Sequence, residues 1–127
     1  MSVKYVVLGK NNPLKPTEAK KYYAQVKSSG ETTLRELAKL ISQTSTVSTA
    51  DVMAVLEGFI EILPQEIARG QIVRLGDFGS FSLSIKSEGE EKEEKVNANS
   101  IKGNKLNFRP GKVVKDALNQ IQYEKDK

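Results

Sequence analysis

The chain has 127 residues, of which 38% are hydrophobic, and twenty basic side chains against sixteen acidic ones give it a net charge of +4. This length and composition are typical of a folding chain with one modest hydrophobic core, and exclude two independent cores. The absence of cysteine and histidine excludes disulfides, thiolate nucleophiles, imidazole bases and zinc sites that need these ligands.

The first thirty residues are predicted to form a small module of their own. Alternating apolar side chains predict a strand over residues 3–8, and residues 21–27 could form a second extended segment. A turn-rich stretch with Pro13 and Pro16 separates the two. The module is basic, and its lysines either extend a positive binding surface or form the solvated side of a capping module. These lysines are Lys15, Lys20, Lys21 and Lys27.

A first helix is predicted directly after this module. Thr33 stands three residues before Glu36, which is the spacing of a capping box. The apolar side chains from Leu34 to Ile41 then fall on one face of a helix. The polar run over residues 42–46 is expected to end it.

A second, longer helix follows. Ser48 stands three residues before Asp51 and predicts its N-cap. Apolar residues then recur every three or four positions as far as Ile67. Pro64 lies inside this pattern, so we expect a kink there rather than an end, and Gly70 is expected to end the helix.

The apolar pattern then changes to the period of two that is typical of strands. Val73 and Leu75 alternate with Arg74, and after a turn at residues 76–77 apolar residues alternate with serines over residues 80–85. These strands are therefore predicted to have one apolar and one polar face.

A long polar stretch separates these strands from the last elements. Residues 87–104 are rich in glutamate and nearly free of large apolar side chains. A returning strand is predicted over residues 105–109. Pro110 breaks it and opens a final helix, whose apolar stripe runs from Val113 to Ile121.

This order of elements, together with two motifs, resembles the bacterial histone-like HU/IHF family of DNA-binding proteins. The first motif is Leu-Gly-Asp-Phe-Gly-Ser-Phe at residues 75–81, where Asp77 takes the place of a family glycine. The second is Phe-Arg-Pro-Gly-Lys-Val-Val-Lys-Asp-Ala-Leu at residues 108–118, which is similar to the segment that opens the family's last helix. The resemblance covers about residues 31–122, so the chain resembles a longer variant with an N-terminal extension.

The resemblance implies an α+β fold of the HU/IHF type, with two N-terminal helices, a three-stranded antiparallel sheet with a projecting β-arm, and a C-terminal helix. Residues 1–30 would be an N-terminal extended module, and residues 31–127 the HU-like DNA-binding domain, with its arm at about residues 86–105. This stretch contains no proline and no arginine. Kinking of DNA by an intercalating proline, which the family uses, is therefore not expected here.

The resemblance also implies a function. It predicts a homodimer that binds double-stranded DNA with little sequence preference, as an architectural protein of the nucleoid. We expect no enzymatic activity, no cofactor, no metal and no small-molecule substrate. The apolar run at the start is too short for a signal peptide and no stretch is as long as a transmembrane helix, so we expect a soluble, cytoplasmic protein without a membrane partner.

Six cations of the sheet and the last helix are predicted to contact DNA. Strand alternation places Lys105 and Arg109 on one face, opposite Leu106 and Phe108. The free N–H groups at the start of the last helix suit a phosphate. Edge-strand charge and a solvated helix face are the alternatives to DNA contact. The predicted DNA-binding residues are Lys86, Lys102, Lys105, Arg109, Lys112 and Lys115.

An alternative function is a scaffold. The acidic first half of the arm and the added N-terminal module also fit a protein-interaction module that keeps the HU fold and binds DNA weakly or not at all. Binding of duplex DNA that falls with salt distinguishes the two hypotheses.

Overall fold

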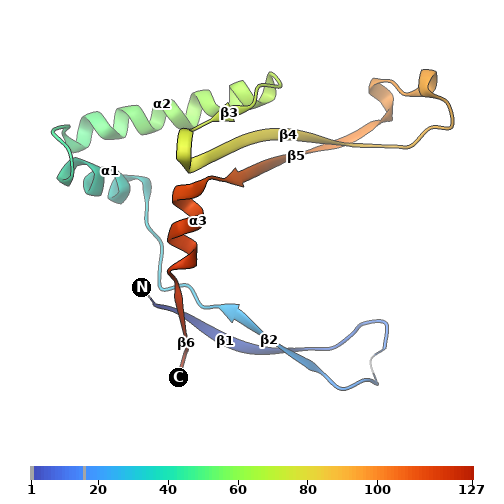
Figure 1. Ribbon diagram of the computed structural model, residues 1–127, viewed down its shortest axis with the longest axis horizontal. Helices are drawn as coiled ribbons and strands as arrows, with labels where there is room; N and C mark the ends of the chain where they lie inside the picture. Colours follow the sequence, from blue (N-terminus) through green and yellow to red (C-terminus); the bar gives the residue numbers. More distant parts are fainter. Residues whose placement is uncertain (1, 16) are drawn as a thin grey trace. The chain divides into compact units, whose positions relative to one another are not determined.

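The computed structural model describes residues 2–15 and 17–127, so the predicted break at Pro16 lies outside the described residues. The chain divides into two compact units. Unit 1 consists of Met1–Thr33 together with Ala117–Lys127, and unit 2 of Leu34–Asp116. The ribbon in Figure 1 shows the elements of both units.

Unit 1 is a three-stranded sheet. Its strands are β1 (Ser2–Lys10), β2 (Lys21–Val26) and β6 (Gln122–Lys125), in the order β2-β1-β6. β1 pairs with β2 in antiparallel fashion and with β6 in parallel fashion. β1 lies where the apolar alternation predicts a strand, and β2 lies where a second extended segment was expected. No pattern in the sequence predicted β6. The final helix is also shorter than predicted, because it ends at Asn119 and leaves Ile121 outside it.

Backbone and side-chain contacts hold the last residues of the chain to the N-terminal strands of unit 1. Backbone hydrogen bonds run from Asp126 N to the carbonyl of Tyr5 (2.9 Å) and from Lys27 N to the carbonyl of Lys4 (2.8 Å). Lys27 Nζ donates to Asp126 Oδ2 at 2.5 Å. This hydrogen bond lowers the pKa of Asp126, with a further contribution from the charges of Lys27 and Lys4, while desolvation opposes it.

Unit 2 begins with two helices, α1 (Leu34–Gln43) and α2 (Thr49–Ala68). The hydroxyl of Ser48 accepts a hydrogen bond from Asp51 N at 3.2 Å, so the predicted N-cap is present. α2 continues through Pro64, and Gly70 follows it with a φ of 86°. No helix in the described part of the chain is both long and apolar enough to cross a membrane.

The rest of unit 2 is a sheet of three antiparallel strands and the start of a last helix. The strands are β3 (Val73–Arg74), β4 (Gly79–Ser87) and β5 (Ile101–Pro110), in the order β3-β4-β5. β5 is followed by α3 (Lys112–Asn119), and the boundary between the units falls within this helix. Three 3₁₀ turns also occur, at Gly76–Phe78, Glu93–Lys95 and Ala98–Ser100.

The two motifs that resemble the HU/IHF family lie against each other. Gly111 N donates to the carbonyl of Phe78 at 2.8 Å. A Cβ on Gly111 would lie 2.2 Å from the carbonyl oxygen of Asp77, and a Cβ on Gly79 would lie 2.4 Å from that of Arg109. Gly79 also has a φ of 140°, which side-chain-bearing residues rarely adopt. Both glycines therefore allow the turn before β4 to meet the turn after β5.

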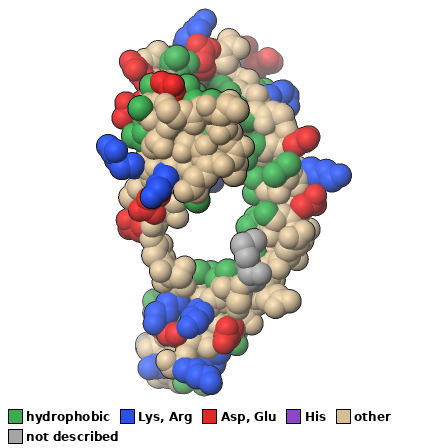
Figure 2. Space-filling model, turned by 90° about the vertical axis from the view of Figure 1, so that its left-hand side faces the viewer, with side chains coloured by type: hydrophobic (Ala, Val, Ile, Leu, Met, Phe, Trp, Pro, Cys, Tyr) green, Lys and Arg blue, Asp and Glu red, His purple; other side chains and the backbone are tan. Residues whose placement is uncertain are grey.

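The apolar residues of unit 2 are incompletely covered. α2 packs against the apolar face of the sheet, with an open cleft of 420 Å³ between them. Among the described residues of the chain, the only buried hydrophobic ones are Ala38, Val52 and Ile67. The chain exposes 10,963 Å², whereas two compact units of these sizes together would expose on the order of 8,000 Å². Figure 2 accordingly shows hydrophobic side chains at the surface, among polar and charged ones.

Candidate nucleic-acid interface

The pairing register of unit 2 gives its sheet two unlike faces. Residues that pair directly across antiparallel strands point to the same face, and neighbours along a strand alternate. Phe81 pairs with Phe108 and Leu83 with Leu106 on the face toward α2. The rings of Phe81 and Phe108 lie 4.8 Å apart. This arrangement packs the two rings together on the apolar face.

The other face is polar and basic, and we call it the basic face. Its first row runs across all three strands, because Arg74 of β3 and Arg109 of β5 both pair with Ser80 of β4. The next rows along the β4–β5 hairpin consist of polar residues and one glycine. They are Ser82 with Asn107, Ser84 with Lys105, and Lys86 with Gly103.

The cations of the basic face are available to a ligand. None of the residues that the register places on it is acidic. Arg74, Lys86, Lys105 and Arg109 are exposed, and none of the four has an acidic partner within 4.0 Å among the described residues. The first rows also border a hollow of 390 Å³, which is lined by both arginines and three polar residues together with Ile72 and Phe108. Such a surface suits a polyanion.

Comparison with known proteins identifies the family. The family model for the HU domain fused to wHTH, Ig, or glycine-rich motif, HU-HIG, matches residues 1–125. This chain belongs to the HU-HIG family. The match includes both units, and so covers β1 and β2 as well as the elements that resemble HU/IHF. The α+β class predicted from the sequence and the HU/IHF resemblance are confirmed.

The HU-HIG chain is also similar in sequence to named proteins of the HU/IHF type. It is 30% identical to integration host factor subunit alpha of Vibrio atlanticus over 95 residues, which cover 73% of this chain and 97% of that protein. It is 26% identical to integration host factor subunit beta of Pseudomonas putida over 90 residues, covering 69% of this chain and 90% of that one.

Two solved structures share the fold. A Bacteroides vulgatus protein provisionally described as DNA-binding superposes with a TM-score of 0.64 at 10% identity, covering 98% of this chain. The HU-HIG chain spans about half of that protein, 47% of its length. An Anabaena HU–DNA cocrystal structure superposes with a TM-score of 0.54 at 19% identity, covering 69% of this chain and 98% of that one.

The structure brings together three of the six predicted DNA-binding residues on the sheet of the HU-HIG chain. Lys86, Lys105 and Arg109 share the basic face. Lys102 does not join them, because the register shifts at this point and leaves it without a partner on β4, as the extra residue of a β-bulge. Its ammonium lies 3.8 Å from Glu88, which partly neutralises it.

The two remaining predicted residues lie on α3. Lys112 is its first residue, and Lys115 N donates to the carbonyl of Gly111 at 3.0 Å. Both side chains are exposed, and neither has an acidic partner within 4.0 Å among the described residues.

Arg74 also belongs to the basic face and was not among the six residues predicted from the sequence to contact DNA. Its signal was present in the sequence, because Arg74 alternates with Val73 and Leu75 and must therefore point away from the apolar face. Only the pairing register shows that Arg74 and Arg109 flank the same serine.

Proposed function

We propose that this chain is an architectural DNA-binding protein that binds duplex DNA through the basic face, as a dimer and with little sequence preference. The observation that carries the proposal is the face itself, where four exposed cations lie among serine hydroxyls and an asparagine amide with no acidic residue between them. Several relatives are named integration host factor subunits, and one structural neighbour is an HU–DNA cocrystal structure.

The proposed mechanism is neutralisation of backbone phosphates. Arg74 and Arg109 present planar guanidinium groups that can each hold a phosphate through two hydrogen bonds, and Lys86 and Lys105 act as point charges. The hydroxyl groups of Ser80, Ser82 and Ser84 can donate hydrogen bonds to further phosphate oxygens. These contacts do not read base edges, so the binding is expected to be insensitive to sequence and to weaken with salt.

The distribution of charge in unit 2 supports this surface. Unit 2 carries twelve basic and twelve acidic residues, so its net charge is zero. The residues of β3 and β5 include four of the bases and none of the acids. The distal segment, residues 88–100, carries five glutamates and two lysines. A phosphate is therefore attracted to the sheet and repelled by the distal segment.

We also propose that the β4–β5 hairpin acts as an arm at about residues 86–105 and that Lys112 and Lys115 add phosphate contacts at the start of α3. The arm would act through the cations at its base, because its distal segment is acidic. Lys102 contributes less than the other lysines in this proposal, since Glu88 is its partner.

The dimer is proposed from the uncovered apolar surface of unit 2. Val55, Phe59 and Ile62 of α2 line an open hollow of 390 Å³, and Val55 and Ile62 are 69% and 57% exposed. Burial of apolar area of this kind stabilises association by roughly 25 cal/mol per Å² before its entropic cost. The occupant is a second copy of this chain. A related HU-family chain is the other outcome of the test, because relatives are named as alpha and beta subunits.

The proposed function is tested by fluorescence anisotropy with a labelled duplex over a series of salt concentrations. The variant Lys105→Glu/Arg109→Glu is compared with Lys92→Glu/Lys95→Glu, which makes the same charge change in the distal segment. We expect the first variant to lose about tenfold or more in affinity and to reduce the salt slope by about 2, because about one counterion is released per phosphate contact. The control is expected to bind like the wild type.

Two results would contradict the proposal. Affinity that does not fall with salt would rule out phosphate neutralisation as the basis of binding. Absence of binding to linear or bent duplexes by the wild type at about 50 mM salt would favour the scaffold function instead.

A further inference from the structure

Unit 1 carries the whole net charge of the chain. It contains eight lysines and four acidic residues, a net charge of +4, whereas unit 2 is neutral. All four tyrosines of the chain also belong to unit 1. None of these lysines belongs to the DNA-binding surface proposed above. The positive charge of unit 1 therefore requires its own explanation.

Two of these lysines face each other directly. Lys10 of β1 and Lys21 of β2 are register partners at the loop end of the β1–β2 hairpin, so their side chains share one face of the sheet. Like charges directly opposite each other destabilise a strand pair. Neither lysine has a carboxylate within 4.0 Å in the described residues, so nothing described in the chain relieves this repulsion. A bound anion would relieve it.

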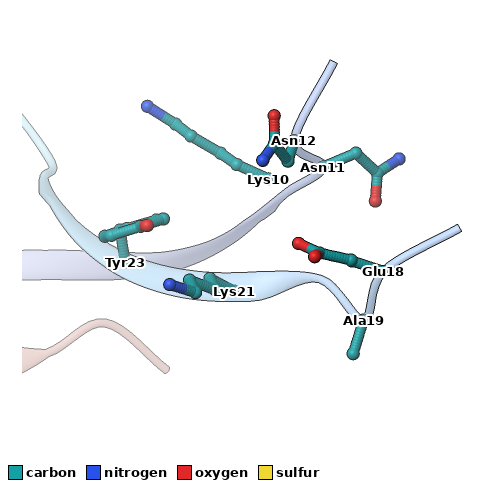
Figure 3. A pocket seen from close by; sticks show the side chains of 7 residues that line it. All are labelled: Lys10, Asn11, Asn12, Glu18, Ala19, Lys21 and Tyr23. Carbon is teal, nitrogen blue, oxygen red and sulfur yellow. The ribbon is translucent and has the colours of Figure 1, made fainter. Parts of the chain in front are cut away.

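The two lysines line a pocket of 380 Å³ together with Asn11, Asn12 and Tyr23. Figure 3 shows both lysine side chains running from adjacent strands toward the side of the hairpin that Tyr23 occupies. Lys10 Nζ lies 5.9 Å from the centre of the Tyr23 ring, within reach of a cation–π interaction. Glu18 and Ala19 complete the lining.

The polar groups of this pocket are mainly donors. Asn12 Oδ1 already accepts from Leu14 N at 3.0 Å, which leaves the amide N–H groups of Asn12 to face a ligand. Lysine ammonium groups only donate. Glu18 is the one acidic residue in the lining, and its carboxylate lies 3.6 Å from the ammonium of Lys15, outside the lining. Donors in excess of acceptors select an anion rather than a cation or an amide.

We infer that this pocket is a second phosphate-binding site, which takes a backbone phosphate of the same duplex DNA. The inference rests on the proposed function for the identity of the ligand, and adds a site in unit 1 to the basic face of unit 2. Lys10 and Lys21 hold the phosphate oxygens, and Asn12 donates a further hydrogen bond. Two sites in one chain raise the overall affinity beyond that of either alone when both are engaged.

The variant Lys10→Glu/Lys21→Glu tests the site by anisotropy with a labelled duplex. Its matched control is Lys125→Glu/Lys127→Glu, which makes the same charge change in the same unit. Lys125 pairs with Tyr5, whose side chain points to the opposite face of the sheet from Lys10. We expect the hairpin variant to lose several-fold in affinity and to reduce the salt slope by about 2. An equal effect of both variants, or no effect of the first, would overturn the site.

A second experiment distinguishes failure of this inference from failure of the proposed function. It measures the changes in the amide chemical shifts of the wild type when a short unlabelled duplex is added. Shifts at Lys10, Asn12 and Lys21 as well as along the basic face are the expected result. Shifts along the basic face alone would overturn the second site and leave the proposed function standing. Changes in chemical shift at the β1–β2 hairpin alone would support the second site and contradict binding of DNA through the basic face.

Discussion

Gly79 and Gly111 connect two motifs that are far apart in the sequence. Each glycine lies where a Cβ would meet a backbone carbonyl oxygen of the other motif, at 2.4 Å and 2.2 Å respectively. These carbonyls belong to β5 and to the 3₁₀ turn before β4, and such backbone groups cannot move aside as a flexible side chain can. The contact aligns the end of β5 and the start of α3 with the start of β4, and so holds Arg109 beside Ser80 in the first row of the basic face.

We therefore predict that Gly111→Ala destabilises the chain by about 2 kcal/mol or more, because the new methyl group displaces the backbone of Asp77. Gly103→Ala is the matched control, since nothing lies within 4 Å of its Cβ position. The control is expected to change the free energy of unfolding by no more than about 1 kcal/mol. Urea unfolding at one fixed protein concentration measures both. Equal effects of the two variants would show that the close approach of Gly111 to the carbonyl of Asp77 does not affect stability.

At the scale of elements, β6 shows what sequence patterns leave out. Its four residues, Gln-Tyr-Glu-Lys, have no apolar alternation, and all four are exposed. The strand exists because β1 offers it a parallel partner and because Lys27 binds Asp126 beyond its end. Both interactions join residues from opposite ends of the chain, so no local pattern could predict them.

This ion pair gives unit 1 a pH dependence. Because the pKa of Asp126 is lowered in the folded chain, the pair stabilises folding above the unfolded value of about 3.9, and this contribution is lost as pH falls through the folded value. We predict that Asp126→Asn lowers the free energy of unfolding at neutral pH and that its difference from the wild type shrinks below about pH 4.

Unfolding followed by tyrosine fluorescence measures this prediction, because all four tyrosines lie in unit 1 and the chain has no tryptophan. Glu18→Gln removes the exposed Lys15–Glu18 pair and is the control, expected to change little at any pH. If the difference in the free energy of unfolding between the wild type and Asp126→Asn stayed constant into the acid range, the predicted titration of the Lys27–Asp126 pair would be contradicted.

The regular elements of unit 2 were predictable because their apolar periods differ, three to four residues in α1 and α2 and two in β4 and β5. Alternation along β5 also predicted that Lys105 and Arg109 share a face. The placement of Arg74 beside them and the loss of Lys102 to a bulge depend on the register between strands. A register is set by contacts between distant residues and cannot be derived from one strand.

At the scale of the whole molecule, the uncovered apolar surface is the main feature of unit 2. Leu83, Ile85 and Leu106 of the sheet and Val55 and Ile62 of α2 are each at least 40% exposed. Apolar surface on this scale marks an interaction site rather than a solvated surface. The proposed dimer accounts for it without any change in the basic face, since the two faces of the sheet are separate.

We predict that the wild type is a dimer at micromolar concentration and that Val55→Asp/Ile62→Asp shifts it to monomer or unfolds it, because two charges would be buried without partners. Gln65→Asp, on an exposed position of the same helix, is the control. Sedimentation velocity and far-UV circular dichroism together distinguish dissociation from unfolding. A wild type that sediments as a folded monomer would contradict the proposed dimer, and a partner chain of another sequence would then be required.

Site-specific crosslinking tests the central claim most directly, and the absence of cysteine from the chain makes single-cysteine variants unambiguous. Ser84→Cys places a photoactivatable label on the basic face, and Gln65→Cys places it on an exposed position of α2, which packs against the opposite face of the sheet. We predict that Ser84→Cys crosslinks to a duplex and that Gln65→Cys does not. Crosslinking from Gln65→Cys alone, or equally from both, would contradict binding of DNA through the basic face.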